Sequence, residues 1–175
     1  AFIDYMPGLS NGLQNTCIKK PLIIVEGIDF GYKDHWTGCY GGKCGNAGLI
    51  DLMNGYVLNP YESKLKDRIE PWAAIEKAPK FISELRNKGY DIFYIDFHNG
   101  ADYMENNAQL VVKFIQLLNE RKCSDEELVV VGASMGGVVA KYALSYMEQN
   151  HLPHCVRTYL SFDAPHQGAN IPYGL

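Results

Sequence analysis

Residues 128–144 have the sequence Leu-Val-Val-Val-Gly-Ala-Ser-Met-Gly-Gly-Val-Val-Ala-Lys-Tyr-Ala-Leu, and this stretch decides the fold. A run of valines ends at Gly132, and a pattern compatible with a helix begins at Met135. The segment therefore predicts a strand, one sharp turn and a helix, with G-x-S-x-G at Gly132, Ser134 and Gly136. Such a turn strains the serine backbone and lifts its Oγ above the sheet edge, and the two glycines avoid a mutual clash.

The turn has two other interpretations, a nucleotide-binding loop and a turn that serves packing. A dinucleotide fingerprint would use Gly132, Ser134 and Gly137, but it needs a glycine where this chain has the serine. A P-loop is excluded, because no Gly-Lys-Ser/Thr follows. The turn could also serve packing alone, with no chemistry. The complete strand–turn–helix context favours a nucleophile elbow.

Three segments in the same order resemble lipase-type α/β-hydrolases. Residues 132–144 are similar to their elbow and following helix, whose pattern is G-H-S-x-G-G-x-x-A-R-Y-x-L. Residues 161–168, Ser-Phe-Asp-Ala-Pro-His-Gln-Gly, resemble the Thr/Ser-Pro-His-x-Gly segment after the next strand, and residues 21–29 resemble the oxyanion strand. The chain departs from the pattern at Ala133 and Glu26, where those enzymes have histidine, which places it off the main lipase branch.

Composition narrows the class of protein. With 175 residues, of which 47% are hydrophobic, the chain is long enough for one domain with its own core. The net charge of −4 argues against nucleic acid or an anionic membrane as the main partner. No apolar run approaches the ~20 residues of a membrane span. No signal peptide is visible, although the chain starts at Ala1 rather than Met. No cofactor or metal is expected.

The five cysteines leave the redox compartment open. Cys39 and Cys44 lie in a glycine-rich loop that could close a small disulfide, and the alternative is two free thiols. A metal site is the weaker interpretation, because no second pair or suitable histidine accompanies them. A disulfide would favour a secreted protein over a cytoplasmic one.

The remaining sequence predicts alternating strands and helices. Residues 1–20 have no clear period and suggest a leading arm, whereas residues 30–70 suggest a long insertion that forms a lid or a wall of the site. Asp102 with Glu105 predicts a capping box for a helix that ends at Arg121. Further strands are expected at 22–25, 92–97 and 157–162, and further helices at 72–88 and 135–148.

This alternation predicts an α/β fold: a three-layer, α/β-hydrolase-like core with about four parallel strands. Residues 1–175 would form one incomplete domain, and the strand at 129–131 would lie between those at 22–25 and 157–162. The C-terminal strands that the resembled family adds are expected to be missing. The uncovered sheet edge would then favour self-association.

The resemblance implies the site residues. Ser134 would be the nucleophile, and the backbone N–H groups of Met135 and Ile28 would form the oxyanion hole. Asp163 is a candidate acid, and His166 is a candidate base, although the histidine of this segment is structural in the resembled enzymes. The preferred interpretation places the catalytic histidine and acid beyond Leu175.

The function expected from these features is hydrolysis of a lipid or small-molecule carboxylic ester by acyl transfer through Ser134. The alternatives are a catalytically silent binding or structural domain and a nucleotide-binding α/β domain. If the base is missing, residues 1–175 alone should hydrolyse activated esters only weakly.

Overall fold

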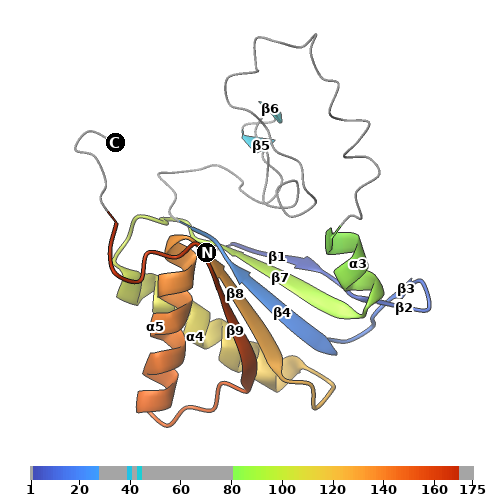
Figure 1. The fold of residues 1–175 in the computed structure, drawn as a ribbon. Helices are drawn as coiled ribbons and strands as arrows, with labels where there is room; N and C mark the ends of the chain where they lie inside the picture. The colour runs from blue at the N-terminus through green and yellow to red at the C-terminus, as the bar shows by residue number, and fades with distance from the viewer. Residues whose placement is uncertain (1, 28–38, 41–42, 45–80, 170–175) are drawn as a thin grey trace.

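A five-stranded sheet organises the computed structural model, which describes residues 2–27, 39–40, 43–44 and 81–169 (Figure 1). The strand order is β1-β7-β4-β8-β9. The four strands β7, β4, β8 and β9 run parallel, and β1 pairs antiparallel with β7 at one edge. Their bounds are Phe2–Met6 for β1, Lys20–Val25 for β4, Tyr90–Asp96 for β7, Leu128–Ala133 for β8 and Val156–Phe162 for β9. The α/β fold, the parallel strands and the position of β8 between β4 and β9 confirm the sequence prediction.

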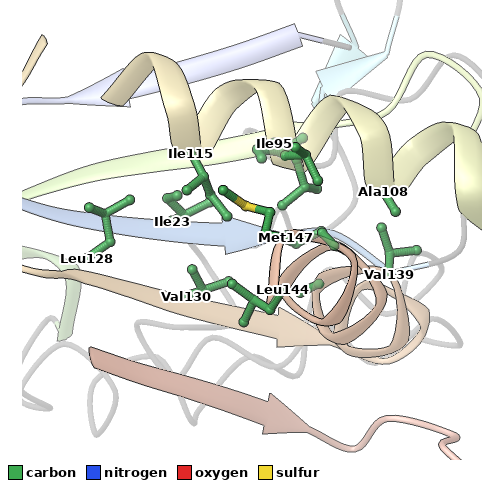
Figure 2. Packing of buried hydrophobic residues seen from close by; sticks show 14 of the residues in the cluster. Ile23, Ile95, Ala108, Ile115, Leu128, Val130, Val139, Leu144 and Met147 are labelled. Carbon is green, nitrogen blue, oxygen red and sulfur yellow. The ribbon is translucent and has the colours of Figure 1, made fainter. Parts of the chain in front are cut away.

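Helices cover both faces of the sheet. Helices α4 (Met104–Arg121) and α5 (Met135–Gln149) lie side by side on one face, and α3 (Phe81–Asn87) lies on the other (Figure 1). The larger core fills the space between the sheet and the first pair of helices, where Ile23, Val130 and Met147 have no exposed surface (Figure 2). A smaller cluster that includes Ile82 of α3 covers the opposite face. Strands buried on both faces explain the continuous apolar runs in β4 and β7.

The sequence suggested that residues 1–20 form a leading arm, but the structure shows paired strands in this segment. Strand β1 pairs along β7 from Phe2↔Asp96 to Met6↔Ile92. Strands β2 (Leu9–Ser10) and β3 (Leu13–Gln14) then form a short hairpin across Asn11 and Gly12, both of which have positive φ. The Asn-Gly pair at the turn is a sequence signal for a two-residue hairpin.

Asp91 of β7 fastens this N-terminal segment to the sheet. Its carboxylate is fully buried and accepts hydrogen bonds from the backbone N–H groups of Gly8 at 2.9 Å and Lys19 at 2.7 Å. The Asn15 side-chain amide and the Tyr5 hydroxyl also donate to it. A buried carboxylate with this many donors fixes the chain that surrounds it.

A disulfide between Cys17 and Cys123 gives a second, covalent attachment. Its Cα atoms are 6.2 Å apart across 106 residues of sequence, and it joins the segment before β4 to the segment after α4. This bond was not predicted. The two cysteines of the predicted loop disulfide, Cys39 and Cys44, lie opposite each other in the backbone ladder between β5 (Cys39–Tyr40) and β6 (Lys43–Cys44). Their disulfide stays a prediction.

The capping box predicted at Asp102 and Glu105 is wrong. Helix α4 begins at Met104, and the side chain of Tyr103, at the capping position, makes no capping hydrogen bond. Asp102 instead accepts a hydrogen bond from the N–H of Tyr103, its direct neighbour, at 2.7 Å. The helix starts one residue later than a cap at Asp102 would require.

Other predictions fall partly outside the described residues. Of the insertion at 30–70, only the β5–β6 ladder is described, and of the helix at 72–88, only α3. Within the described ranges, no helix has both the length and the apolar character needed to cross a membrane. Strand β9 ends the sheet as described, and Leu160 and Phe162 on it are 51% and 69% exposed.

Candidate active site

Ser134 lies in the sharp turn between β8 and α5 that the sequence predicted. Its φ of 51° and ψ of −127° lie in a region that residues with a side chain rarely adopt. The N–H of Ser134 donates to the carbonyl of Phe162 on β9 at 2.9 Å, and its carbonyl accepts from Gly137 at 3.1 Å. The serine is exposed, and these backbone bonds hold its strained conformation.

Glycines allow the chain to turn this tightly. A Cβ on Gly132 would be 2.5 Å from the carbonyl oxygen of Gly136, which confirms the crowding expected across the turn. Gly137 has a separate role: a Cβ there would be 2.5 Å from the Cβ of Ala164 in the segment after β9. The second glycine of the Gly-Gly pair therefore lets that segment pack against the start of α5.

The end of β4 passes beside the serine. A Cβ on Gly27 would be 3.1 Å from the Cβ of Ser134 and 3.6 Å from its Oγ. The backbone that follows β4 thus enters the region where an oxyanion donor is expected. Ile28, the donor implied by the resemblance, lies outside the described residues. Met135, the other expected donor, is the first residue of α5, where N–H groups have no partner within the helix.

Glu26 occupies the position where the resembled enzymes have histidine, and a free carboxylate there would oppose a developing oxyanion. The side chain is only 2% exposed, and its Oε1 accepts a hydrogen bond from the N–H of Phe97. Phe97 follows β7, which lies on the side of β4 opposite to β8 and Ser134. The carboxylate is therefore engaged on the side of β4 away from the serine.

His166 and Asp163 both lie in the exposed segment after β9. The His166 Nε2 is 2.7 Å from the Oγ of Ser161, so that ring is paired with a different serine. Asp163 directly follows β9 with a φ of 48°. Among the described residues, no histidine hydrogen-bonds the hydroxyl of Ser134. No sequence signal predicts the Ser161–His166 pair, because the pair depends on how the turn at 163–168 folds back.

Comparison with known proteins agrees with this geometry. A crystal structure of the mature form of lipase BlEst2 from Bacillus licheniformis superposes with a TM-score of 0.51 at 18% sequence identity. The match covers 94% of this chain and 48% of the lipase, so the chain spans about half the length of that enzyme. No curated protein sequence matches.

The family comparison covers more than half of the chain. The family described as the PGAP1-like alpha/beta domain matches residues 78–174, which include β7, β8, β9 and the turn at Ser134. The structural match supports the same type of fold. The chain therefore belongs to the PGAP1-like alpha/beta domain family and has an α/β-hydrolase fold of the lipase/esterase type.

Proposed function

We propose that this protein is a serine hydrolase that cleaves carboxylic esters by acyl transfer through Ser134. The observation that carries the proposal is the backbone of Ser134, which is exposed and strained at the N-terminus of α5. Strain at an exposed residue brings no gain in packing, whereas it is expected where a nucleophile must stand clear of the sheet.

The proposed reaction has two steps. The Ser134 Oγ attacks the ester carbonyl carbon while a general base takes its proton, and the carbonyl oxygen becomes an oxyanion. The N–H of Met135, reinforced by the dipole of α5, stabilises that charge together with a donor from the segment after β4. The intermediate collapses to an acyl-serine and releases the alcohol, which receives the proton from the base. Water then releases the acid by the same route.

His166 is the candidate base that the resemblance offers among the described residues, and its partner there is Ser161 rather than Ser134. We therefore assign His166 a structural role in holding the turn after β9 and leave the base outside the described part of the chain. This assignment makes a distinct prediction: replacing His166 should affect folding of the turn rather than the pH dependence of turnover.

A fluorophosphonate probe tests the proposal, because it labels only serines with a functioning oxyanion hole and base. In a chain that includes the base, Ser134 should be labelled, and Ser134→Ala should abolish both labelling and hydrolysis of p-nitrophenyl acetate. Ser83→Ala, at an exposed serine on α3, is the matched control and should change neither. Absence of labelling in a folded chain that includes the base would favour a silent domain.

A second pair of variants tests the role of His166. His166→Ala and Ser161→Ala remove the two partners of the same hydrogen bond. If His166 is structural, both variants should lower thermal stability by a similar amount and leave the pH profile of any esterase activity unchanged. A loss of activity confined to His166→Ala would instead assign the base to His166.

A further inference from the structure

A basic pocket lies at the end of the sheet opposite to Ser134. It has a volume of about 330 Å³ and lies between the β2–β3 hairpin and the turn that joins α3 to β7. Lys20 begins β4 and Tyr90 begins β7, so the pocket opens at the amino ends of the parallel strands. Ser134 follows the carboxyl end of β8, about 20 Å away along six residues of extended strand.

The described residues that line this pocket include three lysines, three asparagines and a serine, but no carboxylate. Lys19, Lys20 and Lys88 supply the positive charge, and Ser10, Asn11 and Asn87 add neutral donors. Three ammonium groups around one cavity repel each other, and the chain as a whole has a net charge of −4. The positive charge is therefore concentrated locally, and a bound anion would reduce the repulsion between the lysines.

The pocket is built on fixed backbone. The buried carboxylate of Asp91 accepts from the N–H groups of Lys19 and Lys20 at 2.7 and 3.3 Å. Asn15 closes the hairpin with an N–H donated to Gly8 at 2.8 Å, and its side-chain amide reaches the carbonyl of Gly89 at 3.4 Å. The disulfide between Cys17 and Cys123 also attaches this segment to the chain that follows α4. The lysines thus extend from positions that are already ordered.

The charge of the pocket matches a dianion. The three lysines carry three positive charges, and the buried carboxylate of Asp91, which accepts from the backbone of Lys19 and Lys20, lowers the local net charge by one. Lysine binds a phosphate group as a point charge with three rotatable donors, whereas arginine binds carboxylate or phosphate through a planar fork. The nearby arginine on α3, Arg86, does not line the pocket and donates its Nε–H to the carbonyl of Pro7.

We propose that this basic pocket binds a phosphomonoester. The phosphate would lie among the three ammonium groups, and the neutral donors and remaining volume would accommodate a small polar group esterified to it. The site is one for binding rather than chemistry, and it is separate from the proposed ester hydrolysis at Ser134. The phosphomonoester could be a soluble compound or the headgroup of a lipid, and the experiment below distinguishes these sources.

The experiment is a calorimetric titration of the protein with glycerol 1-phosphate. The double variant Lys19→Gln/Lys88→Gln should weaken binding by about 10-fold or more, because it removes two charge-assisted contacts. The control Lys113→Gln/Lys141→Gln removes the same charge from exposed positions on α4 and α5 and should change binding by less than about 2-fold. Inorganic phosphate should compete, and acetate should not.

Vesicles identify the source of the phosphomonoester. Phosphatidylcholine vesicles that contain phosphatidic acid are compared with vesicles that contain phosphatidylserine, whose phosphate is a diester. The ligand is a lipid headgroup if the protein binds vesicles only when they contain phosphatidic acid, needs Lys19 and Lys88 for this, and does not bind glycerol 1-phosphate. The ligand is a soluble compound if glycerol 1-phosphate binds saturably. Equal binding to both vesicles, equal effects of the two double variants, or no binding of either probe would overturn the proposal.

Discussion

Gly136 at the start of α5 touches the carbonyl oxygen of Glu26, which directly follows β4: a Cβ at residue 136 would be 1.9 Å from that oxygen. This contact brings the helix that follows the nucleophile against the strand that precedes Gly27. It therefore sets the position of Ser134 relative to the backbone that is expected to supply an oxyanion donor.

Gly136→Ala should be severely destabilising. The obstacle is backbone on both sides, so neither partner can rotate away, and the expected cost is about 3 kcal/mol or more. Urea unfolding followed by circular dichroism measures it. Gly12→Ala is the control, since a Cβ there meets nothing within 4 Å and only the φ of 80° is strained. That variant should lose about 1 kcal/mol, and an equal loss in both would contradict the steric explanation.

Ser134→Gly should be more stable than Ser134→Ala. Alanine keeps the strain of a φ near 51°, whereas glycine adopts this region freely. The gain should be about 1 kcal/mol, after the larger entropy of unfolded glycine is subtracted. Thermal unfolding of the two variants gives the comparison, and neither should react with a fluorophosphonate. If alanine were equally stable, the turn would be unstrained.

The sequence was most informative where the pattern was local. Three signals depend only on neighbours within a few residues: the valines of β8, the glycines at 132 and 136, and the period of α5. They predicted the strand–turn–helix and the parallel sheet correctly. Strand β1 was missed because it is stabilised by pairing with β7, some ninety residues away along the chain.

The same limit applies to the site. The contacts of Glu26 with Phe97 and of Ser161 with His166 are set by how separate segments meet, and residue type alone does not specify them. The bond between Cys17 and Cys123 was equally invisible, because a pairing across 106 residues leaves no spacing signal. Glycine spacing could reveal the elbow, since its crowding arises within five residues.

Loss of the Cys17–Cys123 disulfide should lower stability substantially. A cross-link over a loop of this length restricts the unfolded chain, and removing it should cost about 2–5 kcal/mol. The variant Cys17→Ser/Cys123→Ser is compared with the wild type by urea unfolding, with and without reductant. Cys155→Ser, at an exposed free cysteine, is the control and should unfold like the wild type. A reductant that leaves the wild-type midpoint unchanged would contradict the prediction.

Asp91→Ala should release the N-terminal segment from the sheet. The variant leaves the N–H groups of Gly8, Lys19 and Lys20 without their buried acceptor, at an expected cost of about 3 kcal/mol or more. Hydrogen exchange should show faster exchange at these amides before any change in α5. Asp125→Ala removes an exposed carboxylate and should leave exchange unchanged. If these amides exchanged as slowly in Asp91→Ala as in the wild type, the disulfide alone would hold the N-terminal segment.

Tyr5 should make the protein sensitive to alkaline pH. Partial burial, followed by the charge and the hydrogen bond of Asp91, raises the pKa of Tyr5 to about 12 from its ordinary value of 10.0. Because the folded pKa lies above the unfolded one, the stabilisation is complete below pH 10 and is lost as the pH rises toward 12. Tyr5→Phe cannot ionise and should lose less stability over this window than the wild type. The measurement is the urea midpoint of both proteins as a function of pH across this range. If the two midpoints fell in parallel, Tyr5 would ionise in the folded protein as it does in the unfolded chain.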